Sequence, residues 1–171
     1  ELDHDFLWRV HKEVPAKGQI AIFNRSHYED IIAVRVKKIF PDPVWKRRYK
    51  HVLDFESMLA EEGTVIIKLF LNISKEEQKK RLESRLQDPD KLWKFCMDDL
   101  DDRNRWDEFQ TAYQDLIEKT STPEAPWYII PADRKWYRNL VVARLMVEKL
   151  RHLQLSLPTP NFDPASIIIP D

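Results

Sequence analysis

Glycine is scarce in this sequence, which has only Gly18 and Gly63 among its 171 residues. Neither lies in a glycine-rich loop of the kind whose backbone N–H groups cradle phosphates. Cysteine occurs once, as Cys96, which excludes an internal disulfide and fits a reducing cytoplasm. No apolar run approaches the roughly 20 residues that a membrane-spanning helix needs, and the acidic start has no signal-peptide pattern. We therefore expect a cytoplasmic protein with no membrane partner.

Net charge is also nearly absent. The chain carries 28 Lys and Arg against 29 Asp and Glu, so a general attraction to nucleic acid is not indicated. The charges are unevenly placed, because basic residues cluster at 37–50 and acidic ones at 98–102. Local basic patches could therefore bind polyanions. The length suits one domain, and a composition of 43% hydrophobic and 33% charged residues is typical of a folded globular protein.

Helix-like and strand-like patterns alternate along the chain. Apolar spacing predicts helices at residues 6–14, 27–40, 44–62, 74–87, 98–119 and 133–153. Short apolar runs predict strands at residues 19–23, 64–71 and 127–130. Gly63 is suited to end the third helix, Ser74 to Glu77 forms a capping box, and Asp133 can cap the last helix. The alternation predicts an α/β fold, a parallel sheet flanked by helices.

Polar residues follow each expected strand. Ligand sites of open parallel sheets lie beyond the carboxyl ends of the strands, so cations at these ends are candidate phosphate ligands. These residues are Asn24, Arg25, Glu29 and Asp30 after the first strand, Lys75 after the second, and Arg134 and Lys135 after the third. Cations beside carboxylates are the groups that metal-assisted phosphate chemistry uses.

Arg25 can form paired hydrogen bonds to phosphate oxygens, and Asp30 or Glu29 could hold Mg²⁺ directly or through water. The alternative is that Arg25 and Asp30 merely pair with each other at a helix start. We expect Arg47 and Arg48 to be solvated surface residues.

The helix at 74–87 carries Arg81 and Arg85 on one face, and Lys94 follows it. These cations could close over a polyanion, or they could belong to an ordinary solvated helix.

The segment at residues 23–30, with the sequence FNRSHYED, resembles the second motif of the polyphosphate kinase 2 family, which has a P-loop kinase fold. Further matches lie at residues 4–9, 14–18, 93–95, 120–122, 125–128 and 131–137, and the likeness covers about residues 3–152. The resemblance implies transfer of phosphate between inorganic polyphosphate and nucleotides with Mg²⁺. The form HYED is similar to the branch that phosphorylates AMP and also ADP.

The resemblance also implies roles for individual residues. Many relatives have Asp where this chain has Asn24, and Asn cannot supply a full charge to a metal, which shifts that role to Asp30 or Glu29. Arg81 and Arg85 fall in the family's lid helix. We predict catalytic roles for Arg25 and Asp30 and metal binding by Asp30 and Glu29. Phosphate or substrate binding is predicted for Asn24, Glu29, Lys75, Arg81, Arg85, Lys94, Arg134 and Lys135.

The chain departs from the family pattern at its start. Family members carry a Gly-x-Asp-x-x-Gly-Lys loop upstream of these residues, and this sequence has neither that loop nor an initiator Met. We expect the natural N-terminus to lie upstream and the first strand to be missing. The sheet should then show a gap between the strands at 19–23 and 64–71, or a replacement strand from another chain. The domain is expected at 1–153, with a helical lid at about 75–119 and a proline-rich tail at 154–171.

Three functions are compatible with these patterns. The first is a polyphosphate-dependent phosphotransferase acting on AMP and ADP as the full-length protein, with this fragment alone inactive. The second is a fragment that binds polyphosphate without catalysis, and the third is an ATP-dependent nucleoside monophosphate kinase. The expected partners are polyphosphate, adenine nucleotides and further copies of the chain in a dimer or tetramer, but not nucleic acid.

Overall fold

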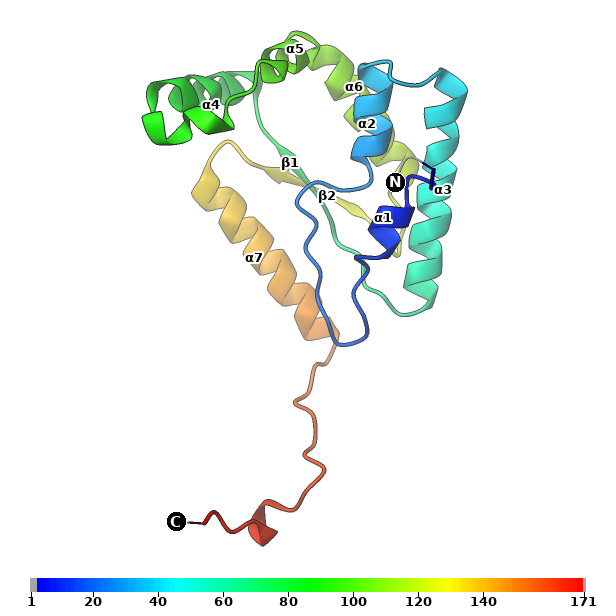
Figure 1. Cartoon of the computed structure of the whole chain (residues 1–171), viewed down its shortest axis with the longest axis vertical. Coiled ribbons are helices and arrows are strands. Elements are labelled where there is room, and N and C mark those ends of the chain that lie inside the picture. The colour runs from blue at the N-terminus through cyan, green and yellow to red at the C-terminus, as the bar shows by residue number, and fades with distance from the viewer. Residues whose placement is uncertain (1–2, 171) are drawn as a thin grey trace.

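Two parallel strands lie at the centre of the structure, a computed structural model that describes residues 3–170 (Figure 1). β1 (Lys68–Asn72) pairs with β2 (Trp127–Pro131), with Lys68 opposite Trp127 and Asn72 opposite Pro131. Helices cover both faces of this pair. The predicted outer limits of the domain and the tail, residues 1 and 171, lie outside the described residues.

The described part of the chain also contains seven α-helices and two short 3-10 helices. They are α1 (Trp8–His11), α2 (Glu29–Val36), α3 (Asp42–Glu61), α4 (Lys75–Gln87), η1 (Pro89–Lys94), α5 (Asp98–Asn104), α6 (Trp106–Thr120), α7 (Lys135–His152) and η2 (Pro164–Ser166). α7 covers one face of the strands, and α2, α3 and α6 lie on the other (Figure 1). The order confirms the predicted alternation for the second and third predicted strands, which are β1 and β2, but not for the first.

The hydrophobic core lies between α2, α3 and α6. Ile31 of α2, Val52 of α3 and Leu116 of α6 are almost completely buried. On α3 the buried residues Trp45, Tyr49 and Val52 follow one another at intervals of four and three, which places them on one face. Burial of each large apolar side chain contributes about 1.5 to 3 kcal/mol, so this three-helix contact is a main source of stability.

Local signals set several helix ends as predicted. Gly63 follows α3 with φ of 91°, a left-handed conformation that glycine adopts without strain. α4 ends at Gln87, before Pro89. The predicted helix at 98–119 is instead two helices, α5 and α6, separated at Arg105.

The capping box at the start of α4 forms only in part. The Ser74 hydroxyl accepts a hydrogen bond from the backbone N–H of Glu77 at 3.1 Å, as predicted. The backbone N–H of Ser74 donates to Asp133 Oδ1 at 2.7 Å, while the Glu77 carboxylate pairs with Arg81. The prediction that Asp133 caps α7 is therefore wrong, and α7 has no side-chain cap. Asp133 instead joins the carboxyl ends of the two strands.

The predicted strand at 19–23 does not form. Ile20 and Ile22 are 66% and 87% exposed, and the segment has no strand partner among the described residues. A strand requires backbone hydrogen bonds from a neighbour, and β1 pairs here only with β2. Direct pairing of 19–23 with β1 is absent from the described residues, which agrees with the predicted gap. The second predicted strand starts at Lys68 rather than Thr64, where its pairing with β2 begins.

The C-terminal segment extends away from the rest of the structure (Figure 1). Leu157 and Ile168 are 92% and 90% exposed, and η2 is the only regular element described after α7. The extended conformation predicted for this segment is confirmed. In the described residues, no helix has the length and apolarity needed to cross a membrane.

Replacing Ser74 by Ala tests the cap of α4. We expect Ser74→Ala to lower the free energy of unfolding by about 1 kcal/mol, because the N–H of Glu77 loses its acceptor. Ser84→Ala is the matched control, since Ser84 is exposed within the same helix, and it should be neutral or stabilising by about 0.5 kcal/mol. Chemical denaturation followed by circular dichroism measures both. Equal effects of the two substitutions would contradict the cap.

Candidate functional site

Arg25 lies in the connection that leads into α2, with an unusual backbone conformation. Its φ is 67°, in the left-handed region that costs a non-glycine residue about 1 to 3 kcal/mol. Its side chain is 80% exposed and pairs with Glu29 at 3.3 Å. The alternative that Arg25 pairs with Asp30 is not what the structure shows. An exposed ion pair is worth at most about 1 kcal/mol, so Arg25 can leave Glu29 for an anionic ligand at little cost.

Asp30 is held by two arginines from other elements. Arg9 of α1 donates to Asp30 Oδ2 at 2.7 Å, and Arg48 of α3 donates to the Asp30 backbone oxygen at 2.6 Å. Arg48 is partly buried by this contact, and burial lowers its pKa, so the expectation that it is a solvated surface residue is wrong. Arg47 is exposed, as expected. The α2 start is thus fixed by side chains from α1 and α3.

The carboxyl ends of β1 and β2 are joined to α4 by polar contacts. Arg81 donates to the backbone oxygens of Ala132 and Asp133, at 2.7 and 3.3 Å, and to Glu77 at 2.8 Å. The backbone hydrogen bond from Ser74, together with nearby Arg81 and Lys80, holds the pKa of Asp133 below its ordinary value. Lys75, Arg134 and Lys135 lie in the same segments, directly after the strands.

Arg85 connects the elements that follow β1. It donates to the Lys94 backbone oxygen at 3.3 Å and to Asp99 at 3.1 Å, so it joins α4, η1 and α5. The Lys94 ammonium lies 5.0 Å from the centre of the exposed Trp93 ring. Arg103 also holds this region, by donating to the Lys75 backbone oxygen. These residues share one helical layer, and the prediction that it acts as a lid stays a prediction.

The predicted residues form two groups. Lys75, Arg81, Arg134 and Lys135 lie at the strand ends, whereas Asn24, Arg25, Glu29 and Asp30 lie at the α2 start. Tyr113 of α6 is near the second group, since burial and the charge of Glu29 raise its pKa while Arg25 opposes that rise, and its ring lies 4.9 Å from Phe70 of β1.

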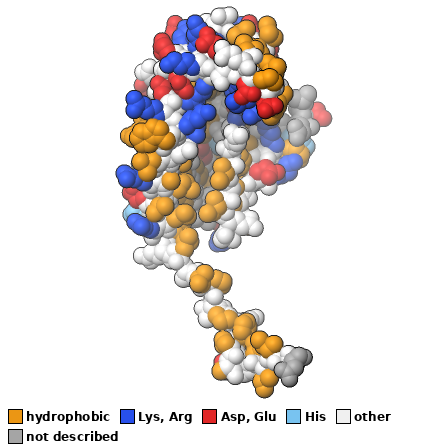
Figure 2. Space-filling view, turned by 90° about the vertical axis from the view of Figure 1, so that its left-hand side faces the viewer, with side chains coloured by type: hydrophobic (Ala, Val, Ile, Leu, Met, Phe, Trp, Pro, Cys, Tyr) orange, Lys and Arg blue, Asp and Glu red, His pale blue; other side chains and the backbone are white. Residues whose placement is uncertain are grey.

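One face of the molecule, the one turned toward the viewer in Figure 2, gathers basic side chains around a depression. Lys and Arg side chains lie on both sides of a hollow in the upper half of this face, and hydrophobic side chains lie below it (Figure 2).

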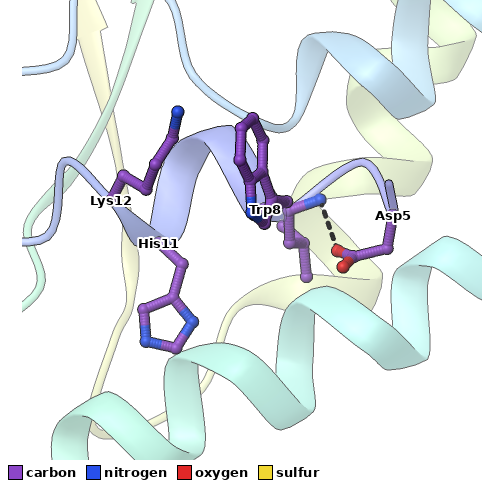
Figure 3. Close-up of a pocket in the computed structure, with 5 residues that line it drawn as sticks. Asp5, Trp8, His11 and Lys12 are labelled. Carbon is purple, nitrogen blue, oxygen red and sulfur yellow. Dashed lines mark hydrogen bonds between the residues drawn. The ribbon is translucent and has the colours of Figure 1, made fainter. Parts of the chain in front are cut away.

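Two pockets lie elsewhere and contain no predicted site residue. One is beside α1, where Trp8, His11 and Lys12 line it and Asp5 accepts a hydrogen bond from the Leu7 backbone (Figure 3). The other lies between α2 and α3, around Lys38 to Asp42.

A buried ionic network lies directly under the α2 start. The Lys68 ammonium donates to Glu56 Oε2 at 2.7 Å, to the Thr120 backbone oxygen at 2.6 Å and to the Tyr28 hydroxyl at 3.2 Å. The Tyr28 hydroxyl donates to Glu56 Oε1 at 2.6 Å, and His27 Nε2 lies 3.3 Å from the same oxygen. The side chains of Lys68 and Glu56 are each only 4% exposed.

The hydrogen bonds of this network set its protonation. Burial favours a higher pKa for the Glu56 carboxyl, but hydrogen bonds from His27, Lys68 and Tyr28 outweigh burial and hold the pKa below its ordinary value. Burial lowers the pKa of the Lys68 ammonium, and the bond to Glu56 opposes that change. Burial and the Glu56 charge raise the pKa of Tyr28, so its hydroxyl keeps its proton and donates.

Residues 1–157 match the sequence model of the family described as Polyphosphate kinase 2 (PPK2). The chain belongs to the polyphosphate kinase 2 family. The match covers both groups of predicted residues and the buried network between them.

Individual members of the polyphosphate kinase 2 family are closely similar. An AMP/ADP-polyphosphate phosphotransferase of Meiothermus ruber is 54% identical over 169 residues, which are 99% of this chain and 63% of that protein. An ADP-polyphosphate phosphotransferase of Rhodopseudomonas palustris is 39% identical over 92% of this chain and 59% of that protein. The chain thus spans less than two thirds of the length of these relatives.

A solved family structure agrees with the fold. The crystal structure of polyphosphate kinase 2 from Arthrobacter aurescens TC1 superposes with a TM-score of 0.92 at 48% identity, over 96% of this chain and 58% of that one. The predicted P-loop kinase-like α/β fold is thereby confirmed.

Sequence reasoning missed Glu56, Lys68 and Arg9. Lys68 was visible as the one charge inside the apolar run at 64–71, and Glu56 as a carboxylate one residue after the buried Phe55. A charge within a buried strand requires a partner, so Lys68 signals a hidden acid. The identity of that acid depends on how α3 packs on β1. Arg9 ends the matching motif at residues 4–9, but nothing in the local sequence marks it as the partner of Asp30.

The depressed pKa of Glu56 predicts how stability responds to acid. A carboxylate whose pKa is lowered on folding stabilises the fold above its unfolded pKa and loses that contribution as the pH falls through the folded value. At neutral pH we expect Glu56→Gln to lower the free energy of unfolding by about 3 to 5 kcal/mol, because Lys68 is left without its counter-charge. The difference from wild type should shrink as the pH falls below about 4.5, the ordinary pKa of this group.

Denaturation curves at a series of pH values measure this dependence. Glu61→Gln is the control, because Glu61 is exposed on the same helix and bonds only to Ser57 among the described residues. Its effect should be small at every pH. A difference between Glu56→Gln and wild type that stays constant into acid would contradict the assignment.

Proposed function

We propose that the full-length gene product transfers phosphate between inorganic polyphosphate and the adenine nucleotides AMP and ADP. The observation that carries the proposal is the 54% identity, along 99% of this chain, to a protein named AMP/ADP-polyphosphate phosphotransferase. The placement of charges supports it, because an exposed arginine precedes α2 while further cations follow β1 and β2 and lie on α4. In the forward reaction, the terminal phosphoanhydride bond of polyphosphate breaks, and a new bond forms to a phosphate oxygen of the acceptor.

Phosphoryl transfer depends mainly on positioning and on neutralising charge. Arg25 is suited to bind the oxygens of the transferring group with its planar guanidinium. Lys75, Arg134 and Lys135 at the strand ends, with Arg81, Arg85 and Lys94 beyond them, would align the polyphosphate chain. Asn24 would contact the nucleotide phosphates. An acceptor phosphate is already a nucleophile, so no strong general base is required.

A divalent metal ion fits the α2 start. Among residues 3–170, no three His, Cys, Asp or Glu side chains group so as to hold a metal. Mg²⁺ does not need such a group, because it commonly binds one or two carboxylates and completes its shell with substrate phosphates and water. Asp30 and Glu29 supply two adjacent carboxylates, which Arg9 and Arg25 now contact. The ion would neutralise charge on the phosphates when bound there.

Other expectations remain predictions. A helical lid at 75–119 is supported by the connection of α4, η1 and α5 through Arg85. The family likeness suggests a homo-oligomer, and the single cysteine suggests a reducing cytoplasm.

Replacing Arg25 by Ala tests its catalytic role. We expect Arg25→Ala to lower kcat/KM for AMP with polyphosphate by about 100-fold or more, because charge on the transferring group loses a preorganised partner. Arg47→Ala is the matched control, since Arg47 is also an exposed arginine but lies on α3 among residues without a predicted role. Its kinetics should equal those of wild type. Formation of ADP and ATP is measured by chromatography, with stability checked in parallel.

The donor distinguishes the competing functions in the same assay. Product from polyphosphate but not from ATP supports the proposal, and the reverse supports an ATP-dependent kinase. Salt-sensitive polyphosphate binding by the full-length gene product without any turnover would support the non-catalytic alternative.

Replacing Asp30 by Asn tests metal binding. We expect Asp30→Asn to raise the Mg²⁺ concentration that gives half-maximal activity by about tenfold, because one charged ligand becomes neutral. Asp54→Asn is the control, since Asp54 is an exposed acid on α3 paired only with Lys50 among the described residues. A magnesium titration that is unchanged in Asp30→Asn would remove Asp30 from the metal site.

A further inference from the structure

We propose that Glu56 and Lys68 are positioning residues that act through Tyr28 to hold the segment 24–30 in its binding conformation. This inference rests on the proposed function, because it assigns a task to that segment. Neither side chain is exposed enough to touch a substrate, so both would act through Tyr28. The network is therefore a support for the site and not part of its binding surface.

The first argument is that packing alone does not call for charges here. Glu56 and Lys68 lie among apolar residues of α3 and β1, and removing an ion from water costs several kcal/mol per group. Well-packed apolar residues of similar volume are often as stabilising as a buried ion pair, or more so. A hydrogen-bonded ion pair also restrains the positions of the elements that carry it, because each hydrogen bond requires its partner within a narrow range of distance and angle.

The second argument is what the network connects. Its members come from four places: Tyr28 and His27 before α2, Glu56 on α3, Lys68 at the start of β1 and Thr120 at the end of α6. The contact continues into β2, since the Tyr28 and Trp127 rings lie 4.9 Å apart edge to face and Trp127 Nε1 donates to Thr120 Oγ1 at 2.9 Å. The Tyr28 side chain thus contacts residues of both strands, and these contacts fix the position of the α2 start relative to β1 and β2.

The third argument is the position of Tyr28 within its segment. Arg25 lies three residues before Tyr28 and Asp30 two residues after it. The turn between them is tight, because the Glu29 N–H donates to the Ser26 oxygen at 3.0 Å and the Asp30 N–H donates to the His27 oxygen at 3.1 Å. A displacement of Tyr28 therefore moves Arg25 and Asp30 together.

The fourth argument links this anchor to the strand ends. Lys68 begins β1 and Asn72 ends it, a span of about 13 Å at roughly 3.3 Å per residue. A paired strand is stiff over that length, so fixing Tyr28 on Lys68 also fixes Arg25 relative to Lys75. The network would in this way set the spacing between Arg25 and the cations that follow the strands.

Replacing Tyr28 by Phe tests the inference, because it removes the hydroxyl and keeps the ring. Tyr49→Phe is the matched control, since Tyr49 is also buried in this core but its hydroxyl does not bond to Glu56 or Lys68. With the full-length gene product, well below its unfolding temperature, we expect Tyr28→Phe to lose at least tenfold in kcat/KM for AMP with polyphosphate. Most of that loss should appear as a higher KM. Tyr49→Phe should match wild type.

The outcomes separate this inference from the proposed function. If wild type shows no polyphosphate-dependent transfer, the proposed function itself fails. If wild type is active and Tyr28→Phe keeps wild-type kinetics while only its stability falls, the network is purely structural and the positioning role is overturned.

A double substitution separates activity from stability. In Glu56→Met with Lys68→Met, apolar side chains replace both charges, so no buried charge is left without its partner, while the Tyr28 hydroxyl loses its acceptor and the Thr120 backbone oxygen loses its donor. The fold should therefore lose less stability than it does in Glu56→Gln. We expect this variant to fold and yet to show a kinetic loss similar to that of Tyr28→Phe. A stable double variant with wild-type kinetics would overturn the inference. Should the double variant fail to fold, the comparison of Tyr28→Phe with Tyr49→Phe decides the question alone.

Discussion

The hydrogen-bonded contact of Lys68 with Glu56 and Tyr28 is the constraint on which the arrangement of this domain depends. Lys68 opens β1, Glu56 faces it from α3, and Tyr28 precedes α2, so three elements far apart in sequence meet at one buried point. Each polar atom there has lost water and must keep its partner. Packing of α2, α3 and α6 supplies most of the stability, but it tolerates small shifts that this contact does not.

Features encoded by a few adjacent residues were predictable from the sequence. The left-handed glycine after α3 and the serine that caps α4 each act within one turn, so the ends they define were found correctly. The segment at 19–23 shows the opposite case. Its apolar run has the composition of a strand, yet a strand exists only where a neighbour supplies hydrogen bonds, and the described residues supply none. The cap predicted for Asp133 also depended on a distant partner, because the Asp133 side chain accepts from the N–H of Ser74, which follows β1.

In the candidate site, too, features set by the order of elements were predictable, and features set by distant partners were not. That Lys75, Arg134 and Lys135 would follow two parallel strands was visible in the sequence, because the order of elements fixes which strand ends share an edge. The residues at 24–30 were expected at the same edge, but the strand before them does not form in the described residues. Their pairing was not visible. Arg25 forms an ion pair with Glu29, four residues later. Asp30 forms an ion pair with Arg9, which is 21 positions away on the four-residue helix α1. Ion pairs are chosen by the approach of whole elements, which local pattern does not encode.

Arg25 and the buried network also explain each other. A left-handed φ at a non-glycine residue persists only where the surroundings fix the backbone more strongly than the strain of about 1 to 3 kcal/mol opposes it. The exposed pair with Glu29 is too weak for that. Three residues later, however, Tyr28 is bound to Glu56, stacked on His27 at 4.6 Å and packed against Trp127, so the chain has little freedom to relax. The contacts of Tyr28 thus hold the backbone of Arg25 in its strained conformation at the surface. Because the backbone at Arg25 is restrained before any ligand arrives, an anion that bound there would have to order only the side chain, so the proposed positioning role would act by lowering the entropy cost of binding.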